Sequence, residues 1–152
     1  MNDDWRHLPA PARPIAAAAT SAVLAARACD TAALDAAATE LGALDPAQTG
    51  LILGTAVRLM LEQAHPDGLD SDAVREVLTS CVRSAPDADP QVVLYLLAGA
   101  LGVLDEDAVP APKPEVLARH AALLLADQLG ARPPQPLFSA ALTEIAHTQL
   151  ND

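Results

Sequence analysis

Aromatic side chains are almost absent from this 152-residue chain, which has one Trp, one Tyr and one Phe, or 2% of its residues. The apolar core must therefore be built from the abundant alanine, leucine and valine. Hydrophobic residues make up 51% and charged residues 19% of the chain, a balance that excludes a wholly disordered protein. A single domain is expected at this length. Such a chain buries roughly 70% of its unfolded surface and needs no disulfide or metal to stay folded.

Basic residues are also scarce. The chain has 9 Lys and Arg against 20 Asp and Glu, for a net charge of -11, and Lys113 is the only lysine. Binding to phosphates requires clustered Lys and Arg, so we expect neither a nucleic acid nor a membrane surface as a direct partner. A basic protein surface stays open as a partner, although acidity also serves solubility. The preference for alanine and arginine is typical of a GC-rich bacterial genome.

Cysteines and long apolar runs are limited too. Cys29 and Cys81 are far apart and match no zinc-binding spacing, which predicts no structural metal, no cofactor and no disulfide. Cys81 lies on an apolar helical stripe and is expected to be buried. The longest apolar run, Val92 to Leu104, is too short to span a bilayer. The apolar stretch Ile15 to Ala26 follows acidic residues, unlike a secretory signal, and we therefore expect a cytoplasmic protein.

The chain does contain a regular series of helix starts and stops. Asp45 and Asp89, each followed by proline, are typical of helix N-caps, and Asp70 is a third. Gly42 and Gly130 are expected to end helices. No segment alternates with the two-residue period of a strand. The helices expected from these signals are 14–28, 32–41, 46–65, one that starts after Asp70, one that starts at Pro90, 114–129 and 137–150.

The short connections between these helices predict an all-α, compact bundle of about seven mostly antiparallel helices. Residues 1–13 are proline-rich and polar and are expected to form an N-terminal arm that carries Trp5, with 14–152 as a single helical domain. The fifth helix is apolar nearly all round, which predicts that it lies with the third at the centre of the fold. A short HEAT-like α-solenoid is the alternative, because the Asp-Pro helix starts recur about 44 residues apart.

Two Glu-x-x-His pairs, Glu62 with His65 and Glu144 with His147, resemble the ligand pairs of di-iron four-helix proteins. Ligands of that kind must point into the bundle. At about 100° per residue both pairs lie away from the apolar centre of their helices, so we expect no metal site. The tripeptide that starts at His65 resembles the loop motif of J-domain co-chaperones. The helix before it carries only Arg58 as a basic residue, and we interpret the tripeptide as a helix stop.

No motif for nucleophilic or nucleotide chemistry is present. The serines lie outside any GxSxG context, and neither GxGxxG nor a P-loop occurs. His120 lies between Arg119 and a run of alanine and leucine and is expected to be half-exposed. Catalytic residues are therefore not predicted. An enzyme with an unfamiliar active site would require His65, His120 or His147 to meet a carboxylate in a cleft.

Small residues gather on one side of the fifth helix, where Tyr95, Ala98, Gly99 and Gly102 lie together. An interior glycine costs roughly 1 kcal/mol relative to alanine, which close approach of a neighbouring helix would offset. We expect that neighbour to be the third helix, so that leucine in place of Gly99 overpacks the core. The alternatives are a homodimer seam and a ligand slot in which Tyr95 offers its hydroxyl.

These observations favour a non-enzymatic domain of adaptor or regulatory type that binds another protein. The support is the acidic surface, the high apolar content, and an arm with tryptophan, a favoured interface anchor. A homodimer is the simplest partner. The candidate interaction residues are Trp5, Tyr95, Gly99 and Gly102. A small-molecule sensor or carrier with an apolar slot is the alternative function, and an enzyme ranks third.

Overall fold

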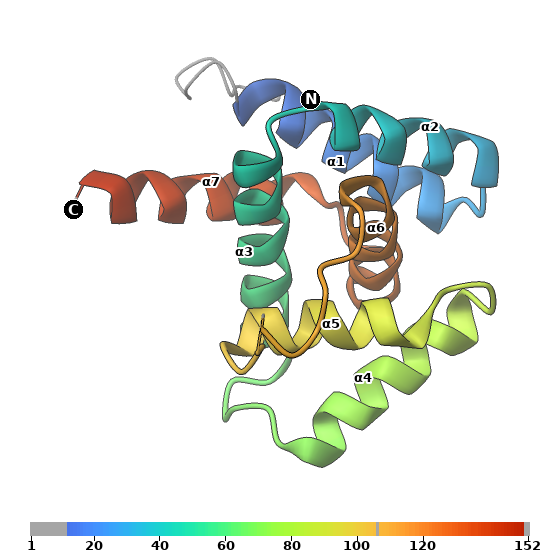
Figure 1. Cartoon of the computed structure of the whole chain (residues 1–152), viewed down its shortest axis with the longest axis vertical. Coiled ribbons are helices and arrows are strands. Elements are labelled where there is room, and N and C mark those ends of the chain that lie inside the picture. The colour runs from blue at the N-terminus through green and yellow to red at the C-terminus, as the bar shows by residue number, and fades with distance from the viewer. Residues whose placement is uncertain (1–11, 106, 151–152) are drawn as a thin grey trace.

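A computed structural model describes residues 12–105 and 107–150, and this part of the chain contains seven α-helices and no strand (Figure 1). The helices are α1 (Ala12–Arg27), α2 (Thr31–Ala43), α3 (Pro46–Ala64), α4 (Ser71–Ser84), α5 (Pro90–Leu101), α6 (Pro114–Leu129) and α7 (Gln135–Leu150). The prediction of an all-α bundle is confirmed. Trp5 lies outside the described residues.

Aspartate side chains begin four of the helices. Asp30, Asp45, Asp70 and Asp89 precede α2, α3, α4 and α5, and each accepts a hydrogen bond from a first-turn backbone N–H at 2.8 to 3.1 Å. These N–H groups have no acceptor within the helix, so each cap contributes about 1 kcal/mol. The three caps expected from the sequence are confirmed, and so is the end of α6 at Gly130.

The first helix begins at Ala12, two residues before the expected start at Pro14. Proline is tolerated in this first turn because its missing N–H would have found no acceptor within the helix. Ala12 is buried against the core, which stabilises the extra residues. Pro14 is therefore the third residue of the helix rather than its first, and residues 1–11, which hold most of the expected arm, lie outside the described residues.

Gly42 does not end α2 but lies inside it. A Cβ at this position would lie 3.1 Å from Glu115 Cβ and 3.2 Å from the Glu115 backbone nitrogen. The first turn of α6 thus passes so close to α2 that only glycine fits without a shift. Gly42 allows α2 and α6 to pack closely and does not terminate α2, so the helix end predicted at Gly42 is wrong.

The centre of the fold is α6, which packs against α1, α2, α3, α4 and α5. Leu124 and Leu125 in its middle are fully buried. Phe138 of α7 is the largest fully buried side chain, and alanine, leucine and valine form most of the remaining core. Alanine-rich faces allow α1 and α2 to approach α6 closely. A core almost without aromatic residues is therefore packed through short distances between helices.

The expected central position of α5 is wrong. This helix packs against α3, α4 and α6 but buries only Val92, Val93 and Leu97 among its described side chains. The opposite side of α5 faces away from the core. Apolar residues all round a helix indicate burial, but they do not determine how many neighbours cover it. α3 and α6, rather than α3 and α5, connect the remaining helices.

The expected antiparallel pattern does not describe the whole bundle. In Figure 1, α3 runs across both α5 and α7, and it contacts each of them. α6 contacts both members of the α1–α2 pair, although they are far from it in the sequence. In a solenoid each unit packs only on its neighbours along the chain, so these contacts do not fit the HEAT-like alternative. The repeated Asp-Pro starts reflect repeated capping chemistry alone.

Candidate functional site

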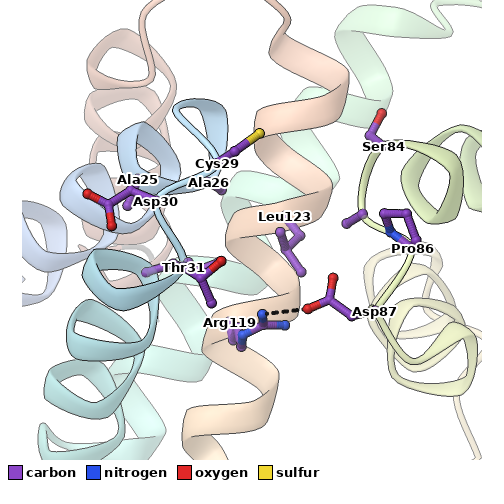
Figure 2. Close-up of a pocket in the computed structure, with 12 residues that line it drawn as sticks. Ala25, Ala26, Cys29, Asp30, Thr31, Ser84, Pro86, Asp87, Arg119 and Leu123 are labelled. Carbon is purple, nitrogen blue, oxygen red and sulfur yellow. Dashed lines mark hydrogen bonds and ion pairs between the residues drawn. The ribbon is translucent and has the colours of Figure 1, made fainter.

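A groove crosses α6 between the α1–α2 turn and the α4–α5 loop (Figure 2). Leu123 of α6 forms its floor, the turn with Cys29 forms one wall, and Ser84 and Pro86 form the other. The groove has a volume of about 190 Å³. Cys29 is exposed and adopts a left-handed conformation with φ 57°. That conformation ends α1, because the Asp30 N–H bonds back to the Ala25 carbonyl at 2.9 Å.

The basic residue of this groove, Arg119, is held by two carboxylates. Arg119 donates from Nε to Asp35 at 2.9 Å and from a terminal nitrogen to Asp87 at 3.2 Å, which ties α6 to α2 and to the α4–α5 loop. No histidine is among the described residues that line the groove. A thiol or hydroxyl nucleophile needs such a base or a lowered pKa for activation. The described lining therefore offers Cys29 and Ser84 no histidine as an activating base.

A cluster beside the groove joins α4 to α6 through Asp127. This carboxylate accepts hydrogen bonds from the hydroxyls of Ser80, at 2.8 Å, and Ser84, at 2.5 Å. Cys81 is buried next to them, as the sequence predicts. Burial of the thiol, with a smaller contribution from the charge of Asp127, raises the pKa of Cys81 from 9.0 to about 11. The Cys81 thiol is consequently protonated and unreactive near neutral pH.

His120 is buried, not half-exposed as expected, with 6% of its surface accessible. Its Nε2 accepts a hydrogen bond from the Asp89 backbone N–H at 3.0 Å, so the ring proton is on Nδ1, which donates to the Val116 carbonyl at 2.8 Å. Both ring nitrogens are occupied by backbone groups. His120 therefore connects α6 to the start of α5 and has no free nitrogen for proton transfer.

The two Glu-x-x-His pairs meet through their glutamates. Arg58 of α3 donates to Glu62 at 2.9 Å and also to Glu144 of α7, so the two carboxylates converge on a guanidinium. His65 caps the end of α3, and His147 lies exposed on the last turn of α7. Within the described residues, no group of three His, Cys, Asp or Glu side chains is arranged to hold a metal ion.

A second surface lies on the outer side of α5. We define the α5 outer face as Leu94, Ala98, Leu101 and Val103. Leu94, Ala98 and Leu101 are separated by four and three residues, a spacing that places them on one side of the helix. Leu94 is 41% exposed, Leu101 39% and Val103 71%. The α5 outer face is thus a row of large apolar side chains in contact with solvent.

The predicted interaction residues of α5 lie beside this face. Tyr95 is half-buried, and Gly99 and Gly102 are exposed. A Cβ at Gly99 would meet only Leu104, at 3.8 Å, and a Cβ at Gly54 of α3 would meet nothing within 4 Å. α3 and α5 do pack together, but not through their glycines. The close approach of α3 expected at Gly99 is therefore wrong, because Gly99 is exposed and a Cβ there would meet only Leu104.

Gly102 has a different role. It follows the last residue of α5 with φ 75°, a left-handed conformation that glycine adopts without strain. The backbone N–H groups of Gly102 and Val103 bond back to Gly99 and Ala98 at 3.2 and 3.0 Å. This turn closes the helix and positions Val103 at the end of the α5 outer face.

A hollow of about 280 Å³ adjoins the Leu101 end of the face. Leu61, Leu69 and Leu101 contribute its apolar lining, from α3, the α3–α4 loop and α5. Arg58, Glu62 and His65 provide its polar wall. The α5 outer face therefore continues into a depression of a size that can receive one large side chain.

The chain matches no family model, no curated protein and no solved structure. Among the described helices, none combines the length and the apolar character that crossing a membrane requires. The described residues form an all-helical bundle in which the α5 outer face is exposed.

Proposed function

We propose that this protein is a non-enzymatic interaction domain, of adaptor or regulatory type, that binds another protein through the α5 outer face. The observation that carries the proposal is the exposure of Leu94, Leu101 and Val103 in one row. Large apolar side chains scattered singly on a surface are ordinary, but a contiguous group often marks a partner site.

The composition of α5 strengthens this argument. Pro90–Leu101 contains no charged residue, although the chain as a whole has a net charge of -11. A helix that faced water alone would be expected to carry polar residues on its outer side. Apolar residues on both sides of α5 are consistent with one side packed on α3, α4 and α6 and the other covered by a partner.

Site-specific photo-crosslinking in cells of the source organism tests this function. A photoreactive phenylalanine in place of Leu94 is expected to form a discrete protein adduct, and the further substitution Leu101→Asn is expected to abolish that adduct. The matched control carries the photoreactive residue in place of Leu24, which lies on α1 and is 47% exposed. The proposal is wrong if the positions 94 and 24 give the same adducts, or if Leu101→Asn leaves the adduct unchanged.

A further inference from the structure

We infer that the occupant of the α5 outer face is an amphipathic helix of another protein, with an apolar stripe bordered by Lys and Arg. This inference rests on the proposed function and adds the chemistry of the partner. It follows from the shape of the face, from the adjoining hollow and from the charges at both ends of α5.

The shape of the face suits a helix. Leu94 and Leu101 are seven residues apart, which corresponds to about 10 Å along α5. Between them lie Ala98 and Gly99, whose small side chains leave room for a second backbone to approach. An amphipathic helix presents apolar residues at positions i, i+3 or i+4, and i+7, a repeat of the same length. One such side chain can enter the hollow beside Leu101.

The charges at the ends of the face are acidic. Asp89 precedes α5, and Asp105 and Asp107 follow it, all three exposed. Arg58 and Glu62 line the hollow, and Arg58 is paired both with Glu62 and with Glu144 of α7, so these three side chains together have a net negative charge. Exposed carboxylates thus precede and follow α5 along the chain, and a further carboxylate lies in the hollow beside Leu101. Basic residues on a partner would complement them and would also accelerate association with a chain of net charge -11.

The same charges disfavour a second copy of this chain. Because exposed carboxylates precede and follow α5, a pair of α5 helices in either orientation would bring acidic segments of one copy towards those of the other. Like charges brought together in an interface oppose association, and here both copies also carry a net charge of -11. A homodimer is therefore the competing outcome that the experiment must detect.

Three peptides of about 14 residues distinguish the possibilities. The first is an amphipathic helix of leucine and lysine, the second replaces every lysine with glutamate, and the third replaces every leucine with serine. Binding of each labelled peptide to the full chain is measured by fluorescence anisotropy at low and physiological salt. We expect the leucine-lysine peptide to bind at least about 10-fold more tightly than either of the others, and more weakly as salt rises.

Two kinds of protein variant, one that alters the apolar row and one that alters the charge, locate the site. Leu94→Asn with Leu101→Asn is expected to weaken the leucine-lysine peptide about 10-fold or more, while the control Leu24→Asn with Leu51→Asn, on α1 and α3, leaves its affinity unchanged. Asp105→Asn with Asp107→Asn keeps the apolar row and is expected to weaken binding several-fold. Circular dichroism confirms that each variant is folded, and the charge variant tests the inference even if the leucine variant unfolds.

Several results would overturn the inference. The leucine-lysine peptide could bind Leu94→Asn with Leu101→Asn as tightly as the control Leu24→Asn with Leu51→Asn, or the serine-lysine peptide could bind as tightly as the leucine-lysine peptide. Either result would mean that the net charge alone attracts the peptide. If the leucine-glutamate peptide bound as tightly as the leucine-lysine peptide, the partner helix would not need Lys and Arg beside its apolar stripe. Self-association that Leu94→Asn with Leu101→Asn abolishes would assign the face to a second copy. This last result would leave the α5 outer face standing as an interaction surface, whereas identical adducts at positions 94 and 24, or an adduct that Leu101→Asn leaves unchanged, would contradict the function itself.

Discussion

At the scale of single residues, the histidine and cysteine side chains have opposite roles according to burial. His120 is held by backbone groups on both ring nitrogens, and Cys81 is buried beside the Asp127 carboxylate. Cys29 and His147 are exposed. Buried His120 and Cys81 contribute to stability, whereas exposed His147 and Cys29 are available to reagents.

Replacement of His120 by leucine is expected to destabilise the protein by about 1 to 3 kcal/mol. Leucine retains most of the side-chain volume but leaves the backbone N–H of Asp89 without the acceptor that Nε2 provides. The free energy of unfolding in urea measures the loss. The exposed His147→Leu is the control and is expected to change stability by less than about 0.5 kcal/mol. Equal effects of the two variants would contradict the role assigned to His120.

Thiol reagents should distinguish the two cysteines. At pH 8 the folded protein is expected to react with one equivalent of a thiol reagent, at exposed Cys29, and the unfolded protein with two. Prior replacement of Cys29 by serine should make the folded protein inert. Rapid reaction of two thiols in the folded state would show that Cys81 is accessible.

The raised pKa of Cys81 also predicts a pH dependence. The pKa of Cys81 is about 11 in the folded protein and 9.0 when the thiol is not buried. Between these pH values the folded state binds more protons than the unfolded state, so the free energy of unfolding falls as pH rises from about 9 towards 11. The expected loss is on the order of 2 kcal/mol. Unfolding of the Cys81→Ala variant, measured over the same pH range, should lack this part of the slope. Parallel curves for the two proteins would contradict the assignment.

At the scale of helices, two glycines with the same helical propensity have different surroundings. Gly42→Ala is expected to destabilise the protein by about 1 kcal/mol or more, because the added Cβ meets the backbone of Glu115 across the α2–α6 contact. Gly54→Ala is expected to stabilise it by about 0.5 to 1 kcal/mol, because α3 gains helical propensity and the Cβ enters open space. Thermal unfolding of both variants measures the difference. Stabilisation by Gly42→Ala as well would contradict the close contact between α2 and α6.

At the scale of the whole molecule, the position of α6 explains why an apolar face of α5 is left open. α6 occupies the centre and contacts five other helices, so α5 lies at the periphery with only its inner side covered. In Figure 1, α4 and α5 lie together at the end of the molecule opposite α1 and α2. The most apolar helix of the bundle is therefore placed where a partner can reach it. This placement supports the α5 outer face as the interaction surface.

The local features of this protein follow from its sequence. Asp45, Asp70 and Asp89 could be recognised as N-caps because a cap is formed between residues two or three positions apart, whatever the rest of the chain does. The burial of Cys81 followed from the periodicity of its own helix. The all-α class followed from the sum of such local signals, and so did the uncharged, small-residue character of α5.

Contacts between distant segments were decided only by the tertiary structure. The sequence indicates a helix end at Gly42, and only the contact with Glu115 of α6 shows that the glycine is needed for packing. The acceptor role of His120 likewise depends on the backbone of Asp89, 31 residues away. Periodicity indicates which side of a helix is apolar, but not whether a neighbour covers it. The side of Gly99 was therefore expected inside the core and is instead exposed. Which helix is central, and which apolar face remains for a partner, depends on how all seven helices pack together.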